Sequence, residues 1–285
     1  METFGHTEVK TLEDENKSKL EQIVRSINFE TLKDIFTELG RKAGLEGDIN
    51  FIPKNKIVLA ADYTDYDPFT NELRLKGLTS ISIMGRTADT LADICHEETH
   101  AVATSQHEGE SKNETSGNEL ESRVSGLSYF ERTGKDYSKD YYRWFNEGVT
   151  DKISKDVFRS YIHRIPTTDI ETGKRIKEDG YVSGYPLAVL FVEGFCKRIA
   201  RESSVPEDVV WGSLTRSYLH NENFDDVEVR DLLKEFFSES FLKRLKQTDY
   251  NHHLIDLAYI VSLFFDVNGD RLSKLIKKFP FPSKE

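Results

Sequence analysis

The sequence predicts an α+β fold, and three observations support this prediction. Between residues 49 and 83 the chain consists of short alternating or β-branched runs separated by turn residues, a pattern typical of a small mixed sheet. Most of the chain after residue 151 instead places apolar side chains at helical spacing. With 285 residues and 37% hydrophobic content, the chain can bury a substantial core. We therefore expect an N-terminal lobe with a small mixed sheet and one prominent helix, and a mainly α-helical C-terminal lobe.

The N-terminal lobe is expected to begin with helical structure. Residues 1–14 are polar and acidic, which predicts a disordered or loosely attached tail. Residues 15–42 then carry apolar side chains at mostly helical spacing, with a break at Asn28 and with Gly40 and Gly44 near the end. We interpret this segment as a helical lead-in to the sheet.

Four short runs predict the strands of the sheet, and one helix follows them. The runs are residues 50–52, 56–60, 73–75 and 79–83. The helix is expected to open near Thr87 or Asp89, where a hydroxyl or a carboxylate can cap its first N–H groups. A polar surface loop over residues 106–117 leads to residues 123–130, which look like a strand that turns at residues 133–135.

The C-terminal lobe is predicted from a series of segments with helical spacing. These segments are residues 152–162, 186–202, 206–219, 227–236, 238–246, 252–265 and 271–278. We accordingly divide the chain into the tail (1–14), an N-terminal lobe (15–135) and a C-terminal lobe (136–285).

The predicted helix contains His96-Glu97-Glu98-Thr99-His100, an H-E-x-x-H signature. Two histidines four residues apart on a helix lie on one face with their Cβ atoms about 5–6 Å apart, a separation that two ligands of one tetrahedral zinc ion can use. Glu97 comes to the edge of the same site, where it can take a proton from a zinc-activated water. Because such a pentapeptide also arises by chance, the site needs a third ligand elsewhere in the chain.

The best third ligand lies in residues 144–151, Trp-Phe-Asn-Glu-Gly-Val-Thr-Asp. A catalytic zinc site of this kind needs a carboxylate from a second element, and Glu147 supplies it. Asp151 follows one helical turn later, where it can accept the free ring N–H of a zinc histidine, preferably His96. The alternatives for the third ligand are His107, Glu108 and Asp136.

Each of the two motifs also has a purely structural interpretation. A helix with two histidines and several acids can be a solvated face, and E-G-x-T-D can be an ordinary capped helix start in which Asp151 pairs with a lysine. Either motif alone is compatible with that interpretation. Their joint occurrence in this order favours the zinc site.

With H-E-x-x-H followed by N-E-G-x-T-D, the chain resembles the gluzincin clan of zinc metallopeptidases, whose best-known members are thermolysin-like. The resemblance covers two short motifs within about residues 75–160. It implies a zincin-like fold in which one helix carries the H-E-x-x-H motif, a second helix carries Glu147 and Asp151, and a substrate cleft lies between two subdomains. The gap between His100 and Glu147 is longer than in thermolysin-like enzymes, so the loop between the motifs differs.

Other zinc peptidase families fit the sequence less well. A metzincin requires Gly at position 103 and His at position 106, where this chain has Ala103 and Gln106. A gluzincin aminopeptidase is expected to carry a G-x-M-E-N-type motif upstream, which residues 82–86 do not supply. The resemblance to thermolysin-like enzymes is therefore retained, with Zn²⁺ as the implied cofactor.

The resemblance implies a zinc-dependent metallopeptidase, and we expect an endopeptidase that hydrolyses peptide bonds by zinc-activated water with Glu97 as general base. The oxyanion that forms also needs a hydrogen-bond donor. The best-placed donors are Tyr185 and then Tyr181, at a Gly-rich entrance to a predicted helix, followed by His163 and His220. Two other functions remain open: a non-catalytic zinc-binding or interaction module on the same fold, and a zinc amidase that acts on a non-protein substrate.

Composition limits the partners of this protein. The net charge of −11 and the pI of about 5.3 disfavour nucleic acid and an anionic membrane surface. No window approaches the roughly 18 apolar residues of a membrane span, and the polar N-terminus has no secretory signal. We expect a cytoplasmic protein whose partner is a peptide or protein substrate. A secreted form without its leader is the alternative, and the oligomeric state is left open.

Overall fold

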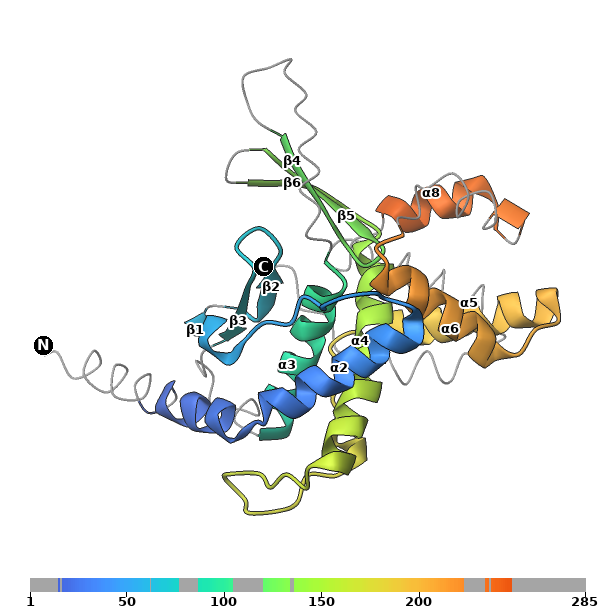
Figure 1. Ribbon diagram of the computed structural model, residues 1–285. Coiled ribbons are helices and arrows are strands. Elements are labelled where there is room, and N and C mark those ends of the chain that lie inside the picture. The colour runs from blue at the N-terminus through green and yellow to red at the C-terminus, as the bar shows by residue number, and fades with distance from the viewer. Residues whose placement is uncertain are drawn as a thin grey trace, which may run out of the picture.

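The computed structural model (Figure 1) describes residues 15, 17–61, 63–76, 87–104, 120–133, 136–222, 234–235 and 237–247. Residues 17–26 are helical, and the named helices are α2 (Phe29–Ala43), α3 (Thr87–Val102), α4 (Arg143–Arg164), α5 (Pro186–Ser203), α6 (Glu207–Leu219) and α8 (Glu239–Gln247), with the short 3₁₀ helices η1 (Lys54–Lys56) and η2 (Glu178–Gly180). The strands are β1 (Ile57–Ala61), β2 (Asp65–Asp67), β3 (Glu72–Lys76), β4 (Leu120–Ser125), β5 (Ser128–Thr133) and β6 (Asp136–Tyr141). The protein is therefore a mixed α and β protein, compatible with the predicted α+β class.

The helical lead-in breaks where the sequence predicts. The side chain of Asn28 accepts a hydrogen bond of 3.0 Å from the backbone N–H of Thr31 and so caps the start of α2. Gly44 ends α2 with a φ of 85°, a conformation that glycine adopts without strain. The break at Asn28 and the end near Gly44 are thus confirmed.

The first sheet is small and mixed, as expected. Its strand order is β1-β3-β2, with β1 parallel and β2 antiparallel to β3. The runs at 56–60 and 73–75 correspond to β1 and β3, whereas β2 was not predicted. The run at 50–52 is not a strand, which corrects the prediction, because the N–H of Ile52 bonds to a side chain of α3 instead of to a neighbouring strand. The run at 79–83 lies outside the described residues.

The second sheet is an antiparallel meander in the order β4-β5-β6 that projects away from the helices in Figure 1. The prediction of one strand over residues 123–130 is wrong, because Gly126 and Leu127 form a two-residue turn between β4 and β5. Gly126 has a φ of 61°, which such turns require. β5 ends at Thr133 and β6 begins at Asp136, so the chain reverses direction where the sequence predicts a turn, at residues 133–135.

Helix α4 is the central helix of the molecule, packed against α2, α3 and α5 (Figure 1). Its contact with α5 is close because Gly148 has no side chain: a Cβ there would lie 2.6 Å from the backbone oxygen of Ala188. The segments predicted at 152–162, 186–202, 206–219 and 238–246 are confirmed as parts of α4, α5, α6 and α8. The predicted helices at 252–265 and 271–278, and most of 227–236, lie outside the described residues.

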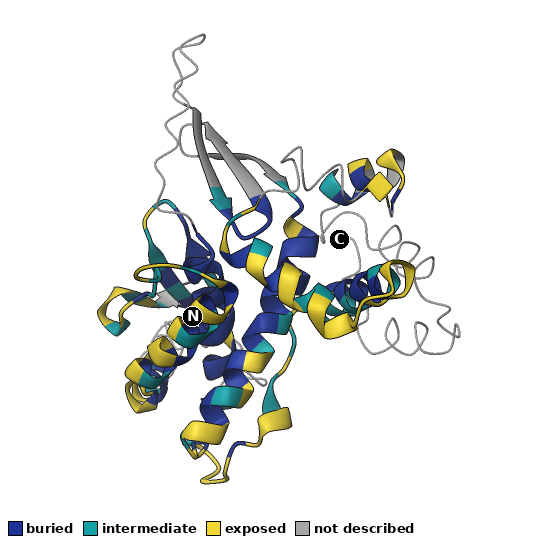
Figure 2. Cartoon of the chain, turned by 45° about the vertical axis from the view of Figure 1, so that its right-hand side comes forward, coloured by how far each residue is buried: buried dark blue, intermediate teal, exposed yellow. Residues whose placement is uncertain are grey.

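One hydrophobic core extends from Leu20 to Leu245 and draws residues from both predicted lobes. Figure 2 shows these buried residues gathered along the helices at the centre of the molecule. The division into two lobes stays a prediction. Within the described part of the chain, no helix has both the length and the apolar character needed to cross a membrane.

Candidate metal centre

Helix α3 carries the H-E-x-x-H motif and is held at its start by a distant segment. The backbone N–H of Thr87 donates to Asp169 Oδ2 at 3.0 Å, and the N–H of Ile170 donates back to Thr87 Oγ1 at 3.0 Å. These contacts satisfy a first-turn N–H that the helix itself leaves unpaired. The cap of α3 is therefore a carboxylate that lies 82 residues further along the chain.

Polar contacts between α3 and α4 fix how the two motifs face each other. The Thr99 hydroxyl donates to the carbonyl of Cys95 at 2.7 Å and lies 2.9 Å from the Ser154 hydroxyl of α4. Ser154 also contacts the carbonyl of Cys95, at 3.2 Å. All three residues are buried, so these hydrogen bonds are made away from water and favour one register between the helices.

The two motifs meet at three side chains. Nε2 of His96 lies 3.0 Å from Glu147 Oε2, and Nε2 of His100 lies 3.2 Å from the same oxygen. The ligand atoms of the three residues all lie within 4.8 Å of one another, and each residue is less than 10% exposed. The structure therefore brings together the two histidines and the carboxylate that the sequence predicts as metal ligands.

The other nitrogen of each histidine faces an oxygen of α4. Nδ1 of His96 lies 3.5 Å from Asp151 Oδ1, and Nδ1 of His100 lies 3.5 Å from Thr150 Oγ1. When each ring carries its proton on Nδ1, both Nε2 lone pairs point toward the carboxylate of Glu147. Three electron-pair donors that converge in this way repel one another unless a positive charge lies between them, so this group could hold a metal ion.

The pKa values of His96 and Glu147 also favour a positive charge at this site. Burial alone lowers the pKa of His96, but Asp151 and Glu147 outweigh burial and raise it well above its ordinary value. Burial alone raises the pKa of Glu147, but the two histidines hold that pKa well below its ordinary value. The carboxylate therefore stays charged and favours a cation beside the histidines.

Glu97 lies beside the three ligands. Burial raises the pKa of its carboxyl group, and the charges of His96 and His100 act in the opposite direction. The neighbouring Glu98 is also buried but faces the core, where its Oε2 accepts the N–H of Ile52 at 3.0 Å. Of these two adjacent acids, Glu97 is the one whose charge interacts with the two histidines and Glu147.

Asp151 is 1% exposed and accepts hydrogen bonds from the segment before α5. The hydroxyls of Tyr181 and Ser183 both donate to its carboxylate, and the backbone N–H of Tyr185 donates to Oδ2 at 3.3 Å. Burial alone raises the pKa of Asp151, but His96 and the two hydroxyls lower it below its ordinary value. Asp151 is thus an ionised residue that connects His96 to a remote segment.

The two tyrosines predicted as oxyanion donors both reach the site, but in different positions. The Tyr181 hydroxyl is used in its bond to Asp151. The ring of Tyr185 stacks on the ring of His96, with centroids 5.6 Å apart and an interplanar angle of 22°. The charge of Glu147, followed by burial, raises the pKa of Tyr185 well above its ordinary value, so its hydroxyl keeps its proton beside the third ligand.

The two histidines considered as further oxyanion donors do not join this cluster. His163 is exposed and lies 3.7 Å from Glu178, and Nε2 of His220 lies 3.0 Å from the carbonyl of Ala43. His107 and Glu108 lie outside the described residues, as does the side chain of Asp136.

A hydroxyl pair that the sequence analysis missed supports His100. Thr150 Oγ1 donates to the carbonyl of Asn146 at 2.8 Å and lies 2.7 Å from the Tyr218 hydroxyl. Because the one Thr150 proton goes to Asn146, Tyr218 donates to Thr150, and Thr150 is left to accept the N–H of His100. The position of Thr150 within N-E-G-x-T-D was the available signal, whereas nothing in the sequence marks Tyr218, 68 residues away.

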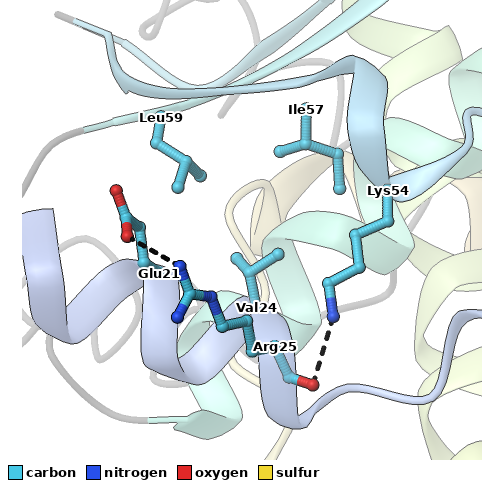
Figure 3. A pocket seen from close by; sticks show the side chains of 6 residues that line it. All are labelled: Glu21, Val24, Arg25, Lys54, Ile57 and Leu59. Carbon is cyan, nitrogen blue, oxygen red and sulfur yellow. Dashed lines mark hydrogen bonds and ion pairs between the residues drawn. The ribbon is translucent and has the colours of Figure 1, made fainter.

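Two further features lie near or beyond the site. Arg143 begins α4, and its Nε lies 3.8 Å from Glu147 Oε1. A separate pocket, of about 240 Å³, is lined by Glu21, Val24, Arg25, Lys54, Ile57 and Leu59. Figure 3 shows how these side chains lie. The charged side chains there are all engaged: Arg25 pairs with Glu21 at 3.3 Å, and Lys54 donates to the backbone carbonyl of Arg25 at 3.1 Å. No predicted site residue lines this pocket.

Comparison with protein-family models, with curated proteins and with solved structures finds no match for this chain. The chemical description of the centre therefore depends on its own geometry. That geometry combines a buried His-His-Glu group that could hold a metal ion, an adjacent acid and a tyrosine that keeps its proton.

Proposed function

We propose that this protein is a zinc-dependent metallopeptidase of the gluzincin type with a zincin-like fold. One observation carries the proposal: Nε2 of His96, Nε2 of His100 and Oε2 of Glu147 converge, while the opposite ring nitrogens face Asp151 and Thr150. Two imidazoles and one carboxylate are the protein ligands of thermolysin-type catalytic zinc sites. The placement of this set on α3 and α4 supports the same assignment.

Zinc is the cofactor that this donor set fits, with His96, His100 and Glu147 as the residues that hold it. Bound there, zinc supplies a Lewis acid that makes water a nucleophile near neutral pH. Glu97 accepts the proton of the attacking water and delivers it to the leaving amine. The Tyr185 hydroxyl donates to the oxyanion that develops on the peptide carbonyl, while Tyr181 remains bonded to Asp151.

The proposed role of Glu97 is tested by Glu97→Gln, which keeps the shape of the side chain and removes its basicity. We expect zinc to be retained at one ion per chain and peptide hydrolysis to fall by about 10²–10⁴-fold, the usual contribution of a positioned acid or base. Zinc content is measured by elemental analysis, and hydrolysis with a library of internally quenched peptides, with and without a chelator.

Glu98→Gln is the matched control, because it makes the same change one residue away on a side chain that faces the core. It is expected to retain full activity. The proposal is contradicted if the parent protein holds no zinc, if chelation leaves peptide hydrolysis unchanged, or if Glu97→Gln is as active as the parent.

A further inference from the structure

The segment from Tyr181 to Tyr185 makes alternating contacts with the metal centre. The hydroxyls of Tyr181 and Ser183 donate hydrogen bonds to Asp151, and so does the backbone N–H of Tyr185. Between them, Val182 is 67% exposed, and a Cβ at Gly184 would meet nothing within 4 Å. Residues 181, 183 and 185 thus contact one buried carboxylate, whereas the two residues between them face away from it.

These contacts use the full hydrogen-bonding capacity of Asp151. Oδ1 accepts the hydroxyl of Tyr181 and faces Nδ1 of His96, while Oδ2 accepts the hydroxyl of Ser183 and the N–H of Tyr185. A carboxylate offers about four acceptor positions, and here four donors approach it. The carboxylate therefore cannot rotate away from His96 without breaking a hydrogen bond to the segment.

The segment is itself fixed on both sides of these contacts. The ring of Tyr181 packs edge-on against the buried ring of Phe158 in α4, with centroids 5.6 Å apart. Tyr185 leads directly into α5, whose first residue is Pro186. The ring of Tyr185 also covers one face of His96. The hydroxyls of Tyr181 and Ser183 are thus presented to Asp151 by packed structure.

We propose that Tyr181 and Ser183 are positioning residues that set the orientation of His96 as a zinc ligand by holding the carboxylate of Asp151, Tyr181 at the oxygen that faces His96 and Ser183 at the other oxygen. This inference rests on the proposed zinc site, and it assigns to Tyr181 a role different from oxyanion stabilisation. His96 of α3 is then oriented by Asp151 of α4, which is held in turn by two hydroxyls of the segment before α5.

The experiment measures the zinc dissociation constant by competition with a chromophoric chelator. The variants are Tyr181→Phe and Ser183→Ala, which each remove one hydroxyl, and Ser183→Thr, which keeps it. Val182→Ala is the matched control, since it lies between the two and faces outward. Tyr181→Phe keeps the ring that packs on Phe158, so its effect reports the hydroxyl alone.

We expect each hydroxyl deletion to weaken zinc binding by about 10-fold and the double variant by up to about 100-fold, the range found for groups that support metal ligands. Ser183→Thr and Val182→Ala are expected to bind within about twofold of the parent, because both keep the two hydroxyls that hold Asp151. The visible spectrum of the cobalt(II)-substituted protein should change in the two deletions and not in the controls, since it reports ligand geometry rather than stability.

The failures of the two proposals are distinguishable. If the parent takes up one zinc ion and both deletions bind it as tightly, only the positioning role is overturned. If Ser183→Thr binds as weakly as Ser183→Ala, the hydroxyl is not the cause and the role is again overturned. If the parent takes up no zinc, the zinc site itself is wrong and this inference falls with it.

Discussion

Glu97 and Glu98 are adjacent in the chain, yet their carboxyl groups have different surroundings. Glu97 lies beside the three predicted ligands, whereas Glu98 accepts the N–H of Ile52 with Oε2 and buries Oε1 without a hydrogen-bond partner among the described residues. Burial raises the pKa of Glu98 well above 4.5. A carboxyl group whose pKa is higher in the folded than in the unfolded protein binds its proton more tightly when folded, so it links stability to pH.

Glu98→Gln is expected to stabilise the protein at pH 8 and to have little effect at pH 4. Because the folded pKa is raised, Glu98 supports folding below about pH 4.5 and loses this contribution as the pH rises through the folded pKa, while the glutamine side chain of the variant does not titrate. The difference amounts to about 1.4 kcal/mol for each unit by which the pKa is raised.

Urea unfolding of the parent and of the Glu98→Gln variant, both in chelator, measures this difference between pH 4 and pH 8. Taking the difference between the two proteins cancels the titration of all other groups. A gap in the free energy of unfolding that stays constant across this range would show that Glu98 has the same pKa in the folded and the unfolded protein, and would contradict the prediction.

At the scale of elements, the approach of α5 to α4 depends on one residue of the second motif. Gly148 follows Glu147 directly, and the backbone of α5 at Ala188 occupies the space where a side chain would be. Trp144 and Phe145 extend the same contact through the ring of Phe191, at 5.1 and 5.8 Å between centroids. The glycine of N-E-G-x-T-D therefore allows the close packing of α5 beside Glu147.

Gly148→Ala is expected to destabilise the protein by about 1–3 kcal/mol, because overpacking displaces backbone that cannot move cheaply. Gly212→Ala is the control, since Gly212 also lies in a helix but a Cβ there meets nothing within 4 Å. The control should stabilise by about 0.5–1 kcal/mol. Thermal or urea unfolding measures both, and equal signs for the two variants would contradict the close contact.

At the scale of the whole molecule, the candidate metal centre joins two helices that share one core. His96 and His100 come from α3 and Glu147 from α4, while the core extends through residues on both sides of the centre. An ion that binds only when these two helices are packed together raises the free energy of unfolding of the whole folded chain.

Zinc at about 100 times its dissociation constant is expected to raise the free energy of unfolding by about 2.7 kcal/mol over the chelator-treated protein. Glu97→Gln should keep this increment, since it leaves all three ligands in place, and His100→Ala should lose it. Denaturant unfolding with and without zinc measures the increment. Equal stability of the parent in zinc and in chelator would contradict metal binding at this centre.

The features that could be predicted from the chain are those that depend on short-range spacing. Apolar periodicity and cap residues place helices such as α2 and α5, because a helix is formed by hydrogen bonds four residues apart. The same periodicity puts His96 and His100 on one face of α3. The roles of these residues as zinc ligands stay predictions, but their mutual placement follows from the local sequence.

The features that required the folded molecule are the contacts between distant segments. Helical spacing predicts that Glu97 and Glu98 point in directions about 100° apart, but the packing of α3 against its neighbours determines which of them lies beside the two histidines and Glu147. The cap of α3 by Asp169, the contact of Tyr218 with Thr150 and the hold of Ser183 on Asp151 have no local signature. These contacts depend on how the helices and strands pack against one another, and the burial of apolar side chains in their common core determines that packing.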